Sequence, residues 1–140
     1  MLTCYIMRGL PGSGKSHKAR QIQKANLRIS PCVIVSADMY YENERGEYNY
    51  NAKEIGNAHL YCMKAFCSVL AEGKSVIVDN CNVTRRDFAF YMRTAFDMGY
   101  NVEIVYPDTN WADNPVACAD KTLHAVPMSV IERMAEMWEK

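Results

Sequence analysis

The sequence lacks several features that define other classes of protein. No apolar run approaches the length of a membrane-spanning helix, and no repeat or low-complexity segment is present. The first apolar stretch has no basic region before it, so we expect no signal peptide and a cytoplasmic location. The formal net charge is zero, so no overall basic field indicates a nucleic-acid partner. We therefore expect a globular protein without a membrane partner.

Cysteine is present, but not in the spacings that bind zinc or form redox pairs. The six cysteines include no C-x-x-C pair and no zinc-type spacing to a histidine. Their apolar surroundings predict buried free thiols in a reducing compartment rather than disulfides. Because 49% of the 140 residues are hydrophobic, we expect one domain, residues 1–140, with a proper core.

The most specific motif covers residues 9–16 and matches the phosphate-binding pattern G-x-x-x-x-G-K-[ST]. An apolar run precedes it and a helix-compatible segment follows it, as the motif requires. Glycines let successive backbone N–H groups turn toward one anion, and the helix N-terminus adds a positive end. We expect ATP here, with Lys15 reaching the β- and γ-phosphates and Ser16 holding Mg²⁺. The predicted ATP-binding residues are Gly9, Pro11, Gly12, Ser13, Gly14, Lys15 and Ser16.

Strand-length apolar runs alternate with helix-length segments along the chain. Strands are predicted over residues 2–7, 32–35, 75–78 and 102–106. Helices are predicted over residues 15–27, 51–72, 84–98 and 110–123, and from Pro127 to about residue 138. This order predicts an α/β fold of the P-loop NTPase or kinase type. We expect a three-layer sandwich with a mostly parallel sheet of about four strands, helices on both faces and a small helical lid over about residues 109–126.

The long predicted helix and the one after it both begin with capping-box spacing, Asn51 to Glu54 and Thr84 to Asp87. The apolar face of the first of these helices is predicted to consist of Ile55, Ala58, Leu60, Met63, Phe66, Val69 and Leu70.

Two carboxylates follow predicted strands at the edge where α/β sheets bind ligands. Asp38 comes after the second strand and Asp79 after the third. A carboxylate beside an acceptor hydroxyl can take its proton during phosphoryl transfer, and we assign this role to Asp38. Asp79 is the candidate for holding Mg²⁺ through water or for organising the site. The structural alternative for each is a helix cap or a turn, and Asn80 and Asn82 are natural turn residues.

These elements, in their order and spacing, resemble the ATP-dependent polynucleotide 5′-hydroxyl kinases. Within that family the chain is most similar to the AAA-like P-loop group related to the kinase half of phage polynucleotide kinase–phosphatases. The resemblance covers nearly the whole chain and rests on residues 8–16, 36–40, 78–82, 111–115 and 124–127. It implies that Asp38 is the general base, that Lys15 and Ser16 hold the phosphates and the metal, and that Asp79 helps to organise the acceptor site.

The chain departs from the phage pattern at two positions. Tyr41 stands where those enzymes carry an arginine that contacts the acceptor phosphate. Lys121 is the best match to their lid arginine, and lysine lacks the bidentate fork of arginine. Arg85 and Arg86 are further candidates for binding a phosphate, with ordinary surface positions as the alternative. The predicted acceptor-binding residues are therefore Asp79, Arg85, Arg86 and Tyr41. The predicted catalytic residues are Asp38, Lys15 and Lys121.

Aromatic residues near these positions have two interpretations each. Tyr40, Tyr41, Tyr48 and Tyr50 either stack on nucleic-acid bases or pack on their own domain. Trp111 either covers an adenine or anchors the lid, and His124 is expected to fix the end of the lid.

The sequence thus predicts a kinase that transfers the γ-phosphate of ATP to a hydroxyl, the 5′-OH of a DNA or RNA end, as in nucleic-acid end repair. Mg²⁺ is the expected cofactor. One alternative is a kinase for a small metabolite or a nucleoside. The other is a nucleotide-binding interaction module with little turnover.

Overall fold

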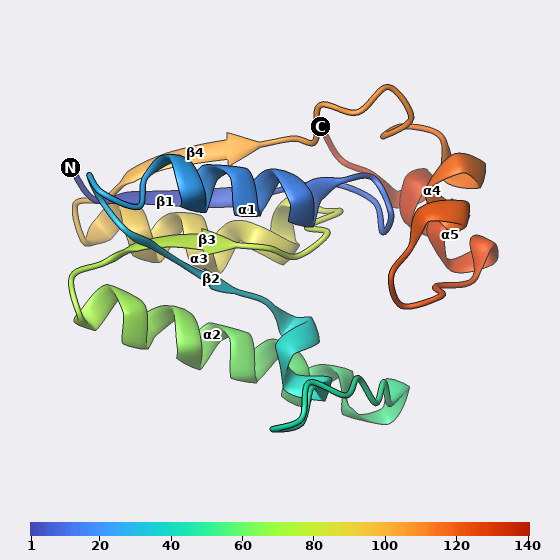
Figure 1. The fold of residues 1–140 in the computed structure, drawn as a ribbon, viewed down its shortest axis with the longest axis horizontal. Coiled ribbons are helices and arrows are strands. Elements are labelled where there is room, and N and C mark those ends of the chain that lie inside the picture. Colours follow the sequence, from blue (N-terminus) through green and yellow to red (C-terminus); the bar gives the residue numbers. More distant parts are fainter.

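Four short apolar strands form a fully parallel sheet in the order β2-β3-β1-β4 in the computed structural model, which describes residues 1–140 (Figure 1). They are β1 (Thr3–Met7), β2 (Cys32–Val35), β3 (Ser75–Val78) and β4 (Asn101–Val105). The register pairs Val78 with Ile6 of β1 and with Val35 of β2. The carboxyl ends of these strands are therefore level, and the segments that follow them emerge at one edge.

Helices cover both faces of this sheet, as the sequence predicts (Figure 1). The helices are α1 (Lys15–Ala25), α2 (Ile55–Ala71), α3 (Arg85–Asp97), α4 (Pro115–Lys121) and α5 (Met128–Met137). Alternate residues of β1 face opposite layers: Cys4 and Ile6 pack in the core formed with α2 and α3, whereas Met7 packs against α1. The three-layer α/β prediction is confirmed.

The last two helices pack at the carboxyl edge of the sheet rather than on its faces (Figure 1). Leu10, Cys118 and Ile131 form a separate small core there. Leu10 belongs to the glycine-rich loop after β1, so α4 and α5 are attached directly to that loop. No helix of the structure combines the length and the apolar character needed to cross a bilayer.

One of the two predicted capping boxes forms and the other does not. At α3 the Asp87 backbone N–H donates to the Thr84 hydroxyl, and the Thr84 N–H donates to the Asp87 carboxylate. Before α2, Asn51 accepts from the N–H of Lys53, but the Glu54 carboxylate accepts from the hydroxyl of Tyr40, 2.8 Å away. A short 3-10 turn, η2 (Ala52–Glu54), precedes α2, and the Glu54 side chain contacts Tyr40 instead of the Asn51 N–H that a capping box requires.

The buried face of α2 also differs from the predicted one. Its buried residues are Ala58, Cys62, Phe66, Val69 and Leu70. These follow helical spacings of three and four, whereas Leu60 lies about 200° round the helix from Ala58 and is 48% exposed. Including Leu60 and Ile55 in the buried face was therefore wrong, and Cys62 was missed because a thiol carries a weaker hydrophobic signal than leucine.

Three smaller expectations also need correction. The predicted helix over residues 110–123 is shorter, because residues 110–113 form turns and Asn114 caps α4 through the N–H groups of Val116 and Ala117. Pro127 lies just before α5 instead of being its first residue. All six cysteines are free, but Cys67 is exposed on α2 rather than buried.

The corrected face of α2 predicts opposite outcomes for two substitutions. Phe66→Ala should lower the free energy of unfolding by about 3–5 kcal/mol, because it removes a fully buried ring from the main core. Leu60→Ala should change it by less than about 0.5 kcal/mol, because this side chain is half exposed. Urea denaturation of both variants measures the difference. A large loss for Leu60→Ala would mean that the helix presents a different face to the core.

Candidate active site

The loop after β1 has the geometry of an anion cradle. Gly12 and Gly14 have φ angles of 79° and 97°, which place both in the left-handed region that favours glycine. The backbone N–H groups of Gly12, Gly14, Lys15 and Ser16 donate no hydrogen bond within the protein. Since α1 begins at Lys15, these unpaired donors coincide with the positive end of a helix. The arrangement provides several N–H groups for one phosphate group.

The outer side of the loop is held by the segment that follows β4. The Trp111 indole N–H donates to the Gly12 carbonyl at 3.0 Å, and the Thr109 hydroxyl donates to the Ser13 carbonyl at 2.7 Å. The carbonyls of Gly12 and Ser13 are thus occupied, and the Ser13 N–H donates to the Leu10 carbonyl at 3.1 Å, whereas the N–H groups of Gly12 and Gly14 remain available. Of the two interpretations of Trp111, the structure shows the anchoring one.

Lys15, Ser16 and Asp79 meet beneath the cradle. The Ser16 hydroxyl donates to Asp79 Oδ2 at 2.8 Å, and Lys15 Nζ lies 3.7 Å from Asp79 Oδ1. Both partners of the ion pair are largely buried, with side chains 11% and 10% exposed. Burial lowers the pKa of Lys15, but the nearby Cys81, Asp79 and Asp38 outweigh this and raise it above its ordinary value. Lys15 is therefore a firmly protonated cation that is kept at the cradle by Asp79.

The same residues fit a magnesium ion that arrives with a nucleotide. Mg²⁺ usually binds through one or two protein oxygens together with phosphates and water, rather than in an all-protein cage. Asp79 Oδ1 is buried and has no hydrogen-bond partner, and the Ser16 hydroxyl lies beside the same carboxylate. These oxygens are suitable ligands, while no group of three or more His, Cys, Asp or Glu side chains forms a fuller cage.

Asp38 lies on the neighbouring strand end. It belongs to the 3-10 turn η1 (Ala37–Tyr41), which follows β2, and its side chain is exposed. The Asn80 side chain ties this turn to the end of β3, because its Oδ1 accepts from the Ala37 N–H at 2.8 Å. The Tyr48 hydroxyl donates to Asp38 Oδ1 at 3.2 Å. The charge of Asp38 contributes, after those of Cys81 and Asp79, to the raised pKa of Lys15.

Sequence reasoning treated Asn80 and Asn82 as turn formers and as part of the family-like segment 78–82, without a contact for either side chain, but both connect strand ends. Asn82 is buried with a φ of 50°, and its Nδ2 donates to the Met7 carbonyl at 2.6 Å. It thereby joins the end of β1 to the segment after β3. The signal in the sequence was available, since both residues lie within four positions of the end of an apolar strand, β3, which ends at Val78.

Arg8 is the other residue that sequence reasoning missed. It is 1% exposed, although it carries a positive charge, and no carboxylate pairs with it. Its guanidinium donates to the carbonyls of Asn82, Val83 and Glu139. The Phe88 and Trp138 rings lie 4.8 and 4.5 Å from it in cation–π contacts. Arg8 thus ties the base of the loop to the last residues of the chain.

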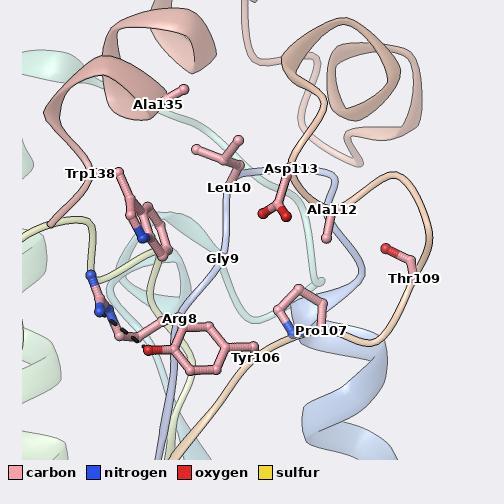
Figure 2. Close-up of a pocket in the computed structure, with 10 residues that line it drawn as sticks. All are labelled: Arg8, Gly9, Leu10, Tyr106, Pro107, Thr109, Ala112, Asp113, Ala135 and Trp138. Atoms are coloured by element: carbon pink, nitrogen blue, oxygen red, sulfur yellow. Dashed lines mark hydrogen bonds between the residues drawn. The ribbon is translucent and has the colours of Figure 1, made fainter. Parts of the chain in front are cut away.

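Figure 2 shows Arg8 in the wall of a cavity of about 400 Å³ beside the first residues of the loop. Tyr106 and Trp138 contribute aromatic surface, and the Asp113 carboxylate points toward the space. None of the predicted catalytic residues lines this cavity. It is therefore separate from the cluster around Asp79.

The remaining predicted site residues are engaged elsewhere or have no contact. Tyr41 is buried and its hydroxyl donates to the Asn51 carbonyl. The Arg85 guanidinium donates twice to the Lys140 carbonyl, at 2.9 and 2.6 Å. Lys121 Nζ lies 4.4 Å from the centre of the Trp111 ring. Arg86 is exposed and forms no ion pair. Their predicted roles stay predictions.

The close packing at Gly12 predicts a strong effect of a single methyl group. Gly12→Ala should greatly weaken ATP binding, because a Cβ would collide with the Cys118 carbonyl in addition to the strain of a positive φ. Gly46→Ala is the matched control, since Gly46 has a φ of 78° but open space around it. Titration of both variants with ATP by calorimetry measures the effect. Equal affinities in the two variants would contradict a role for the contact with Cys118.

Comparison with known proteins places this geometry in a family. The chain is 31% identical over 140 residues to NEDD4-binding protein 2 of Homo sapiens, a match that covers 99% of this chain and 8% of that protein. The chain therefore corresponds to a small part of that relative. Its fold matches a chain of the solved Pnkp1/Rnl/Hen1 RNA repair complex with a TM-score of 0.71 at 20% identity, covering 97% of this chain and 43% of that one.

A gluconokinase from Sinorhizobium meliloti 1021 has the same fold, with a TM-score of 0.63 at 17% identity, covering 99% of this chain and 75% of that one. These structures show that the chain has the fold of the P-loop kinases. A protein-family model described as an AAA domain matches residues 5–140, so this chain belongs to the AAA domain family.

Proposed function

We propose that this domain is an ATP-dependent kinase that transfers the γ-phosphate to a hydroxyl, and that the acceptor is the 5′-OH of a DNA or RNA end. The observation that carries the proposal is the meeting of Lys15, Ser16 and Asp79 under a loop of unpaired N–H groups, with the Asp38 carboxylate on the next strand end. A phosphate cradle with a carboxylate beside it is what phosphoryl transfer to a hydroxyl requires.

Each residue then has a defined task. The loop N–H groups and Lys15 bind the β- and γ-phosphates and neutralise the charge that develops on them. Asp38 accepts the proton of the acceptor hydroxyl as its oxygen forms a bond to the γ-phosphorus. The bond from that phosphorus to the β,γ-bridging oxygen breaks, and ADP leaves with the electron pair. Asp79 and the Ser16 hydroxyl would hold Mg²⁺, which when bound supplies charge neutralisation between the β- and γ-phosphates.

We assign residues 109–126 as the lid of a single kinase domain that comprises residues 1–140. Their attachment to the loop through Thr109 and Trp111 supports this assignment. Arg86 is the candidate for contacting an acceptor phosphate, because Arg85 would first have to release the Lys140 carbonyl. Lys121 reaches the transferring phosphate only if it leaves the Trp111 ring.

Two arguments bear on the acceptor. The resemblance of the sequence elements to polynucleotide 5′-hydroxyl kinases, together with the fold shared with a chain of an RNA repair complex, supports a nucleic-acid end. The loop that follows Asp38 carries three exposed glutamates, Glu42, Glu44 and Glu47, against one exposed arginine, Arg45, and its net negative charge would repel a phosphate backbone. This acidic loop favours the second candidate, a kinase for a small hydroxyl compound such as a nucleoside.

Removal of the proposed base should separate chemistry from binding. Asp38→Asn should lower kcat about a hundredfold or more while ATP affinity changes little, because Asp38 lies outside the phosphate cradle. Glu44→Gln is the matched control, as it neutralises an exposed carboxylate on the neighbouring loop and should leave kcat unchanged. Initial rates with radiolabelled ATP, and calorimetry for ATP affinity, provide the two readouts. Full activity of Asp38→Asn would refute the assignment of the base.

Lys15→Ala should abolish transfer and weaken ATP binding together, because it removes the buried cation that faces the phosphates. Circular dichroism and the melting temperature check that the fold persists. A variant that transfers at the wild-type rate would exclude the cradle as the donor site.

A panel of acceptors decides the substrate class. Labelled ATP is incubated with a short DNA and a short RNA carrying 5′-OH ends, the same strands already 5′-phosphorylated, a nucleoside and a simple sugar. We expect label only on the 5′-OH strands. Label only on a small molecule would establish the second candidate. Tight ATP binding without labelling of any acceptor would instead indicate a nucleotide-binding interaction module.

A further inference from the structure

Tyr48 contacts the proposed base from a small hairpin. The hairpin is closed by an antiparallel bridge between Glu42 and Tyr48, and the Asn49 N–H donates to the Tyr41 carbonyl at 2.9 Å. From this position the Tyr48 hydroxyl donates to Asp38 Oδ1 at 3.2 Å. No other side chain forms a hydrogen bond with Asp38 in the structure. Tyr48 therefore orients one carboxylate oxygen and leaves the other open toward solvent.

The Tyr48 hydroxyl is suited to remain a donor. Partial burial, the charge of Asp38 and the hydrogen bond to Asp38 all raise the pKa of Tyr48 above its ordinary value. The proton thus stays on the phenol at neutral pH, and the hydroxyl does not compete with Asp38 for the proton of an acceptor.

The ring of Tyr48 is contacted by a residue from a different part of the chain. The His124 ring stacks on the Tyr48 ring with 3.7 Å between the ring centres and an angle of 16° between the planes. His124 lies in the connection between α4 and α5, where the Val126 N–H donates to the Thr122 hydroxyl and Ala125 has a φ of 51°. This connection is part of the segment 109–126.

The same segment is anchored to the phosphate loop at its other end. Trp111 donates to the Gly12 carbonyl, and Cys118 packs with Leu10 in the third core. A continuous series of contacts therefore runs from the loop through the segment 109–126 to His124, Tyr48 and Asp38. It joins the two halves of the site without passing through the sheet.

We propose that Tyr48 is a positioning residue for Asp38, and that the stack of His124 on Tyr48 makes the orientation of this carboxylate depend on the docking of segment 109–126 at the loop. The inference rests on the proposed function, because it gives Asp38 the role of base. It adds a second residue, on a different element, that determines how well the base faces the acceptor.

Four variants separate the hydroxyl from the stack. Tyr48→Phe keeps the ring and removes the donor, so kcat should fall about tenfold or more while KM for ATP stays the same. His124→Phe keeps a stacked ring and should retain most of kcat, whereas His124→Ala should lower it as Tyr48→Phe does. Because Tyr48 and His124 act through the same series of contacts, the fold-loss of kcat in the double variant Tyr48→Phe/His124→Ala should be smaller than the product of the fold-losses in the two single variants. Tyr61→Phe is the matched control, since Tyr61 lies on α2 outside the hairpin and its hydroxyl makes no hydrogen bond to Asp38.

A measurement without turnover tests the same linkage. In NMR spectra the Hε1 resonance of His124, assigned by its loss in His124→Phe, should be shifted upfield by the Tyr48 ring. Tyr48→Leu should abolish this shift, and Asp38→Ala should reduce it because Tyr48 loses its anchor.

Loss of phosphoryl transfer in the wild-type protein would refute the proposed function, while an Asp38-dependent His124 resonance would still support the linkage. Wild-type kcat in Tyr48→Phe, a change only in KM for ATP, or a His124 resonance that Asp38→Ala leaves in place would overturn the proposal.

Discussion

The arrangement of the site depends on the register between β1 and β3. Ile6 pairs with Val78, so the two strands end at the same level. The phosphate loop follows β1 and Asp79 follows β3, so these residues meet at one edge of the sheet. The Ser16 hydroxyl lies 2.8 Å from Asp79 Oδ2. A shift by one residue would turn alternate side chains to the opposite face of the sheet and separate these groups. Asn82 supports the register by bonding across the strand ends to the Met7 carbonyl.

The carbonyl groups and the N–H groups of the phosphate loop differ in whether they have partners within the protein. Two of its carbonyls accept from Thr109 and Trp111, whereas the N–H groups of Gly12, Gly14, Lys15 and Ser16 have no partner in the protein. Buried polar groups are normally paired, so a row of free donors at a helix N-terminus indicates an anionic ligand. Bracing from the carbonyl side holds Gly12 and Gly14 in the left-handed conformation, one of several that glycine can adopt, before any ligand binds.

The acceptor side is built differently, from aromatic and acidic residues. Tyr41 packs against Tyr40, Tyr48 and Tyr50, so the residue that stands in place of an arginine supports a tyrosine cluster. Such a cluster shapes the hairpin beside Asp38 and holds Tyr48 where it reaches both Asp38 and His124. Under the proposed function, acceptor selection would rest on the shape of this hairpin and on the charges around it rather than on a fixed phosphate contact.

The sequence by itself determined the elements whose cause is local: the strand ends at Met7, Val35 and Val78, the glycine-rich cradle, and the box at Thr84. It also placed Asp38 and Asp79 at one edge, because parallel topology alone brings strand ends together. Only the tertiary structure decided which competing partner each polar group took. Glu54 bonds to Tyr40 instead of capping α2, Arg85 to the Lys140 carbonyl, and Trp111 to Gly12. These choices depend on contacts between residues far apart in the chain, whose distances no local pattern encodes.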